Sequence, residues 1–284
     1  TSEKRDCEGL KVIEHCNNNN IYSISFIDMS INLDLRYKGN SKNPLQFAPN
    51  HIFVIDKLAK SVLVNLGFNK NNITVVNHPV VGRLRKYFHR KNKNINSIKK
   101  IVFIDEGIDK LNLENTTKNN NYFFHGTGNS INRTIIIFEE LLLALTYSNI
   151  KYELIIRLHP NNDQSFYSEY YNCIDQFSKN TNPYSLIADA DIVVGMTSML
   201  LYETSFINKD HFSIIAQESE KGWLPSIAEK RTKVATNRSM ISEYINLCIS
   251  GSMKTKSSYK LFEKNDDFSI SIINLLNEIN GIQS

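Results

Sequence analysis

The sequence predicts an α/β protein built from doubly wound parallel sheets. Short apolar runs without polar alternation recur along the chain, as is typical of parallel strands that are buried on both faces. Stretches with helical spacing separate these runs, so strands and helices alternate. A basic segment at 83–100 interrupts the alternation, and we therefore expect two domains, over residues 1–90 and 91–284.

The composition is that of a globular protein without a membrane span. The 284 residues are 41% hydrophobic and 22% charged, and no apolar run approaches the roughly 20 residues that cross a bilayer. A net charge of +4, without aromatic residues between the basic ones, does not indicate a nucleic-acid partner. Four cysteines without CxxC spacing favour a reducing cytoplasm over a disulfide scaffold or a metal site.

The first domain shows a helix at 7–17, strands at 21–27, 51–55 and 73–76, and a helix at 57–66 that Gly67 ends. Asp28 ends the first strand, where its carboxylate could act as a general base on an acceptor hydroxyl; a helix or turn cap is the alternative. Arg36 and Glu8 are further polar candidates, for which a surface position is the simpler explanation.

The segment 83–100 holds eight basic residues and almost no acid, which marks a shift in composition. A solvated linker between domains explains it most simply. The functional alternative is a basic patch that meets an anionic membrane surface or an anionic substrate.

The second domain shows strands at 100–104, 152–158, 191–194 and 211–215. Helical spacing is found at 131–147, 166–177, 199–207, 241–248 and 267–280. Because this half alternates fully between strand and helix, we expect it to have a core of its own.

The most informative stretch is 188–204, which predicts a buried strand, a tight turn at Gly195 and a helix that starts at Thr197 or Ser198. A helix N-terminus at the carboxyl end of a parallel strand can bind an anion. Thr197 and Ser198 are therefore candidate phosphate ligands, and Glu203 could accept a pair of ribose hydroxyls. The alternative is a capped helix with a solvated glutamate.

Two other segments carry candidates for the same site. Arg157 and His159 lie at the carboxyl end of a strand, where a guanidinium can pair with a phosphate and an imidazole can donate to one. His125 lies in a loop with Gly126 and Gly128, which would allow the backbone to approach a phosphate closely, although a GxG pattern alone is weak.

These segments together resemble the GT-B fold, which has two Rossmann-like domains and occurs in nucleotide-sugar glycosyltransferases and the UDP-N-acetylglucosamine 2-epimerase group. The resemblance rests on segments 50–60, 67–79, 157–160 and 195–203. The last of these looks like the "GMTSMLLLEA"-type segments of bacterial polysaccharide-biosynthesis proteins. Asn77 and His78 stand where such proteins usually have Gly-Asn, so that turn is altered.

The resemblance implies transfer of a sugar or related group from a nucleotide-activated donor in surface polysaccharide biosynthesis. It implies a saccharide or lipid-linked acceptor, no cofactor besides the donor, no essential metal, and a cytoplasmic location that includes the inner face of the plasma membrane. It also implies that the first domain is incomplete at its N-terminus. An epimerase-type isomerase or hydrolase is one alternative, although the His–Arg–Glu–Asn element of that group is not found; a non-catalytic nucleotide-sugar-binding protein is another.

Overall fold

The computed structural model describes residues 6–30, 32–76, 78–80, 84, 87, 98–107, 117–207, 209–253, 268–279 and 281. The chain divides into two compact units, Thr1–Gly82 with Leu261–Ser284, and Arg83–Lys260. The predicted division at residues 90 and 91 differs from this one in two respects. The change of unit comes a few residues earlier, and the C-terminal residues group with the first unit instead of the second.

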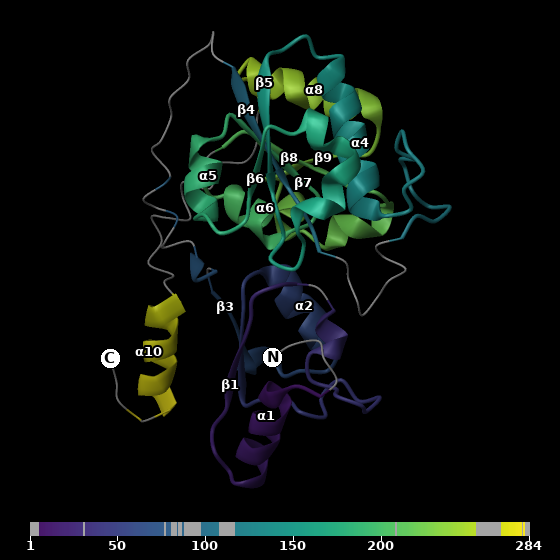
Figure 1. The fold of residues 1–284 in the computed structure, drawn as a ribbon. Coiled ribbons are helices and arrows are strands. Elements are labelled where there is room, and N and C mark those ends of the chain that lie inside the picture. Colours follow the sequence, from purple (N-terminus) through teal and green to yellow (C-terminus); the bar gives the residue numbers. More distant parts are fainter. Residues whose placement is uncertain are drawn as a thin grey trace. The chain divides into compact units, whose positions relative to one another are not determined.

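The first unit contains a parallel sheet in the order β1-β2-β3 (Figure 1). Its elements are α1 (Glu8–Asn18), β1 (Ile24–Ile27), β2 (His51–Val54), α2 (Lys57–Asn65), β3 (Ile73–Val75) and α10 (Phe268–Ile279), with 3-10 helices at Leu33–Leu35 and Lys70–Asn72. The Asp56 carboxylate accepts a hydrogen bond from Ala59 N at 2.7 Å, which fixes the start of α2. Buried side chains of α1, α2 and all three strands form one apolar cluster.

The second unit contains a six-stranded parallel sheet in the order β6-β5-β4-β7-β8-β9. The strands are β4 (Lys99–Ile104), β5 (Tyr152–Arg157), β6 (Gln176–Ser178), β7 (Ile192–Gly195), β8 (His211–Ile214) and β9 (Lys233–Ala235). The chain builds outward from β4 through β5 to β6, and then returns to the other side of β4 with β7. The strand order therefore reverses between β4 and β7, and the carboxyl ends of these two strands flank the crevice in which sheets of this kind bind ligands.

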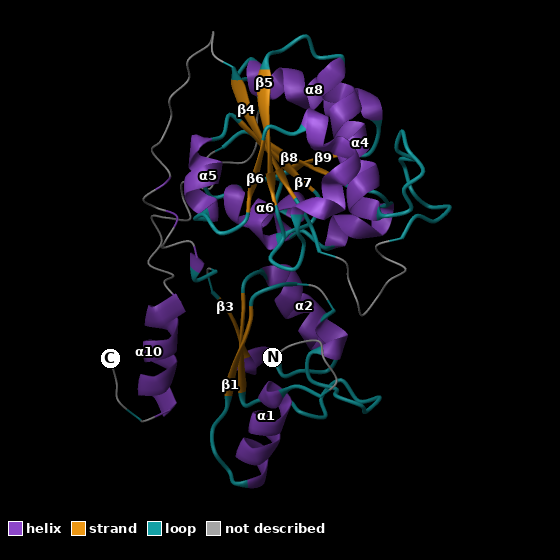
Figure 2. Cartoon of the chain, viewed as in Figure 1, coloured by secondary structure: helices purple, strands orange, loops and turns teal. Residues whose placement is uncertain are grey.

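Helices cover both faces of this sheet. They are α4 (Arg133–Thr146), α5 (Pro183–Asp189), α6 (Met199–Thr204), α7 (Pro225–Ala228) and α8 (Arg238–Ile249), with 3-10 helices at Gln164–Cys173 and Glu218–Gly222. In Figures 1 and 2, α4 and α8 pack together on one face, and α5 lies with α6 on the other. The two parallel-sheet α/β units confirm the predicted fold class.

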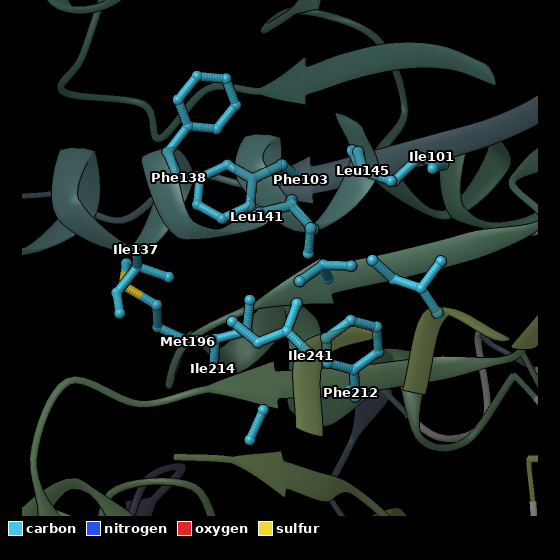
Figure 3. Packing of buried hydrophobic residues seen from close by; sticks show 14 of the residues in the cluster. Ile101, Phe103, Ile137, Phe138, Leu141, Leu145, Met196, Phe212, Ile214 and Ile241 are labelled. Atoms are coloured by element: carbon cyan, nitrogen blue, oxygen red, sulfur yellow. The ribbon is translucent and has the colours of Figure 1, made fainter. Parts of the chain in front are cut away.

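The core under α4 and α8 explains the apolar pattern of the strands. On the face of β4 that α4 covers, Phe103 lies beside Leu141 and Phe138, and Ile101 lies beside Leu145 (Figure 3). The Phe103 and Phe138 rings lie 5.3 Å apart between centroids, in a tilted arrangement. Val102 and Ile104 are equally buried, because the other face of the sheet is also covered.

Some predicted elements were wrong. The helix expected at 166–177 is a 3-10 helix, Gln164–Cys173, with a non-helical Tyr167, followed by the edge strand β6. The pattern misled because Tyr167, Tyr171 and Phe177 pack among neighbouring aromatic rings without forming a continuous helical face. The short elements α5, α7 and β9 were not predicted.

Most of the basic segment 83–100 lies outside the described residues, as does Asn77 of the altered turn. Within the described ranges, every helix is too short or too polar to cross a lipid bilayer.

Candidate functional site

The candidate site lies where β4 and β7 end at the reversal of strand order. Asp105, Glu106 and Gly107 follow β4, while Thr197 follows β7 after one intervening residue. Arg133, the first residue of α4, reaches the same place because Asn132 caps that helix and accepts from Thr134 N and Ile135 N. The carboxyl edge of the sheet therefore gathers charged groups from segments far apart in sequence.

Arg133 is the centre of a buried ionic network. Its Nε donates to Glu220 Oε1 and its Nη2 to Glu220 Oε2, both at 2.8 Å, in a bidentate pair. Its Nη1 donates to Glu106 Oε2 at 2.9 Å, and Nη2 also donates to Thr197 Oγ1 at 3.2 Å. Trp223 lies beside the guanidinium, with its ring centroid 5.5 Å from Cζ.

Burial and charge act in opposite directions on the pKa values of this network. Burial by itself lowers the pKa of Arg133, but the charges of Glu220 and Glu106 outweigh it and raise that pKa above its ordinary value. Burial also raises the pKa of Glu220, because Arg133 and the N–H of Ala216 offset only part of the lost hydration. The guanidinium therefore stays charged at neutral pH despite its burial.

Thr197 takes part in this network through both its backbone and its side chain. Its N–H donates to Glu106 Oε1, and its Oγ1 donates to Glu106 Oε2 at 3.2 Å. Ser198 instead caps α6 and accepts from Leu201 N at 3.2 Å, which confirms the predicted helix start. The two neighbouring hydroxyls thus have different partners.

Gly195 is the last residue of β7 and not the centre of a turn. A Cβ there would meet Ile104 Cβ and Leu201 Cδ2, each at 3.4 Å. These are ordinary van der Waals distances, and Gly195 does not have a positive φ, so the unusual backbone conformation predicted for this glycine is not observed. Glu203 lies half-buried on α6.

His159 lies beside the same strand end, held through Asp105. The buried Asp105 carboxylate accepts from His159 N at 3.0 Å and from Tyr167 Oη and Asn162 Nδ2, each at 2.8 Å. Burial raises the pKa of Asp105, although these three donors act in the opposite direction. The His159 ring packs against Gly107, where an added Cβ would lie 2.7 Å from Nδ1.

Arg157 is the last residue of β5, and its side chain extends toward β6, away from the strand reversal. Its Nη1 donates to Ser178 Oγ and Thr181 O, both at 3.0 Å, at the carboxyl end of β6. Desolvation lowers its pKa from the ordinary value. The structure therefore brings His159 and Thr197 to the end of β4 but directs Arg157 toward the edge strand.

The loop that contains His125 is occupied by the protein's own carboxylates. Gly126 N donates to Glu140 Oε1 at 3.0 Å, while Thr127 N and Gly128 N donate to Glu139 Oε2 at 2.8 and 3.1 Å. His125 itself is exposed. Glu139 fills the space beside both glycines, so a phosphate at this loop would have to displace that side chain, and the role of Gly126 and Gly128 stays a prediction.

Asp28 follows β1 in the first unit, and its side chain is exposed. Its role as a base stays a prediction. Across the described ranges, no group of three or more His, Cys, Asp or Glu side chains is arranged to hold a metal ion.

Sequence patterns did not single out Glu106, Arg133 or Glu220. Glu106 carried the only usable signal, an acidic residue directly after a predicted strand. Arg133 and Glu220 are separated by 87 positions and meet only because α4 and the segment after β8 converge on one edge of the sheet.

Comparison with solved structures finds proteins of similar fold. A putative UDP-N-acetylglucosamine 2-epimerase from Listeria monocytogenes matches 97% of this chain and 72% of its own, with a TM-score of 0.60 and 10% identity. The UDP-GlcNAc 2-epimerase of Methanocaldococcus jannaschii, solved in complex with UDP-GlcNAc and UDP, matches 95% of this chain and 72% of its own, with a TM-score of 0.58 and 13% identity. Anabaena HepE in complex with UDP-glucose matches 87% and 68%, with a TM-score of 0.50 and 11% identity.

The fold is of the GT-B type. Identities of 10–13% establish this fold and nothing finer. No protein-family model matches the sequence, and no curated protein does.

Proposed function

We propose that the protein is an enzyme that binds a nucleotide sugar at the β4–β7 edge of its second unit. The observation that carries the proposal is the cluster of anion-binding donors at this edge, namely the Arg133 guanidinium with the N–H and hydroxyl of Thr197. These groups lie where sheets with this strand order bind nucleotides. The same fold holds UDP-GlcNAc and UDP in the Methanocaldococcus jannaschii epimerase and UDP-glucose in Anabaena HepE.

We propose transfer of a sugar or related group to an acceptor as the reaction. Donors at Arg133 and Thr197 would stabilise the negative charge that develops on a departing diphosphate, with His159 close by at the end of β4. Glu203 would bind the ribose hydroxyls, and Asp28 would take the acceptor proton. A saccharide or lipid-linked acceptor in surface polysaccharide synthesis fits this role, with the protein at the cytoplasmic face of the membrane.

An epimerase-type reaction is the second candidate, because solved 2-epimerases are among the structures with this fold. The residues after β4 argue against it. The loop between β4 and α4, which contains His125, lacks the His–Arg–Glu–Asn element that the epimerase group is expected to have near there.

A thermal-shift screen of nucleotides and nucleotide sugars tests the binding step. A ligand present at about 100 times its dissociation constant should add roughly 2.7 kcal/mol to the free energy of unfolding. Thr197→Ala and Glu203→Ala should lower the shift, while Asp28→Asn should leave it unchanged and reduce turnover only. If no nucleotide or nucleotide sugar shifts the transition, the proposed function is wrong.

Product analysis separates the reactions. Incubation with a UDP-sugar alone yields an isomer or a free sugar from an epimerase-type enzyme, whereas a transferase needs an acceptor to release UDP. Binding without any product under either condition would favour a non-catalytic binding protein.

A further inference from the structure

Glu106 accepts hydrogen bonds from both donors of Thr197 and from Nη1 of Arg133, the guanidinium nitrogen that does not bind Glu220. Its Oε1 accepts from Thr197 N, and its Oε2 accepts from Thr197 Oγ1 at 3.2 Å and from Arg133 Nη1 at 2.9 Å. A backbone N–H, a hydroxyl and a guanidinium are the groups that bind a phosphate in proteins. A carboxylate therefore stands where the proposed ligand would place a phosphate oxygen.

We propose that Arg133 and Thr197 form the phosphate subsite of this protein, and that Glu106 fills the subsite until a nucleoside diphosphate displaces it. The proposal rests on the proposed function, since it assumes that the ligand carries a diphosphate. It assigns Arg133 as a binding residue and Glu106 as the residue that sets the affinity for the phosphate group.

The partners of Arg133 divide into a fixed half and an exchangeable half. Glu220 holds Nε and Nη2 from a fully buried position and also accepts from Ala216 N at 3.0 Å. Nη1 faces Glu106, whose side chain is 12% exposed against 4% for Arg133 and 0% for Glu220. Solvent thus reaches the network at Glu106, and loss of this partner leaves the guanidinium oriented by Glu220.

The charge balance makes Glu106 the partner that Arg133 can lose. One guanidinium faces two carboxylates, so the cluster of Arg133, Glu106 and Glu220 carries one excess negative charge when both acids are ionised. Rotation of the Glu106 side chain out of the subsite removes that excess and leaves a neutral pair with one charged donor directed outward. The Glu106 backbone can stay in place, where its carbonyl accepts from Thr134 Oγ1 and Asn162 Nδ2, each at 3.3 Å.

A tryptophan beside Arg133 can report the displacement of Glu106. Trp223 is the only tryptophan of the sequence, and its ring lies 5.5 Å from the guanidinium carbon of Arg133. A change in what Arg133 binds should therefore alter tryptophan fluorescence without any label.

The test compares UDP with uridine on the full chain, by tryptophan fluorescence and by calorimetry. Glu106→Ala should bind UDP about tenfold more tightly than the unaltered protein, because the phosphate no longer displaces a charge-assisted hydrogen bond. Uridine, which lacks phosphate, should bind both proteins equally. The control Glu218→Gln removes an exposed carboxylate that pairs with Lys221, and it should change neither affinity.

The outcomes distinguish this proposal from the proposed function. If UDP binds the unaltered protein and Glu106→Ala does not bind it more tightly, Glu106 does not compete with phosphate, and only the inference fails. An equal gain for uridine would also overturn it, since the gain would not depend on phosphate. If neither protein binds UDP, CDP, GDP or ADP, the proposed function fails as well. Glu106→Gln, which keeps the shape and removes the charge, should show a smaller gain in the same direction and replaces the alanine variant if that variant does not fold.

Discussion

Arg133 and Glu220 form a bidentate ion pair, with both N–O distances at 2.8 Å and side-chain exposures of 4% and 0%. The pair joins the first turn of α4 to the 3-10 helix after β8, and it fixes the orientation of the guanidinium at the strand reversal. Such a pair is costly to bury, but once buried each partner depends on the other.

Replacement of one partner of this pair should therefore lower the stability of the protein strongly. We expect Glu220→Gln to lower the free energy of unfolding by about 3 kcal/mol, because it leaves a buried guanidinium with less than its full set of acceptors. Urea denaturation measures this change. The control is Glu218→Gln in the same segment, where the carboxylate is 67% exposed and the cost should stay within about 0.5 kcal/mol. Equal costs for the two variants would show that the buried pair adds nothing to stability.

Gly126→Ala should destabilise the second unit by about 2 kcal/mol. Gly126 has a φ of +71°, which side chains resist, and a Cβ there would overlap Glu139 Oε2. Gly222→Ala is the matched control, because a Cβ at that position meets no atom within 4 Å. Thermal unfolding of both variants checks the difference. A Gly126→Ala variant as stable as Gly222→Ala would contradict both the positive φ at Gly126 and the position of Glu139.

Stability should fall between neutral and mildly acidic pH because of His211. Burial lowers the pKa of this side chain to about 4, from an ordinary value of 6.5 that we assume for the unfolded chain. The unfolded chain then binds a proton in this interval that the folded chain does not, so stability is present above pH 6.5 and is lost as the pH falls toward 4. We expect a loss of about 2 kcal/mol between pH 7 and pH 5 from this group.

The pH effect is measured as the difference between the unaltered protein and His211→Gln, in urea unfolding at both pH values. The variant should lose less stability over the interval, even if it is less stable throughout. His15→Gln, at an exposed position on α1, should leave the pH dependence as it was. If the free energy of unfolding changes with pH equally in all three proteins, His211 is not the source of the pH dependence.

Arg157 and Thr197 should differ in their effect on nucleotide binding, although sequence patterns proposed both as ligands. Thr197 belongs to the donor cluster with Arg133, whereas Arg157 donates to Ser178 and Thr181 at the edge of the sheet. We expect Thr197→Ala to weaken UDP binding about tenfold and Arg157→Ala to weaken it less than threefold. Calorimetry measures both, and a larger loss from Arg157→Ala would move the phosphate site toward β5 and β6.

The buried strands could be predicted from sequence because burial on both faces leaves a continuous apolar run, as in β4 and β7. The edge strands β6 and β9 could not, since each has three residues and only one of them is fully buried. The start of α6 could be predicted at Thr197 or Ser198, because a helix cap depends on local sequence, and Ser198 is the residue that caps it. The network around Arg133 could not be found in this way, because it depends on contacts across 27, 64 and 87 positions that only the strand order brings together.

The helix α10 comes last in the chain, yet it groups with the unit that begins the chain. During synthesis, the second unit is complete in sequence before the first one is, because residues 83–260 emerge ahead of the segment that contains α10. The first unit thus gains its α10 segment only after the whole of residues 83–260 has been synthesised.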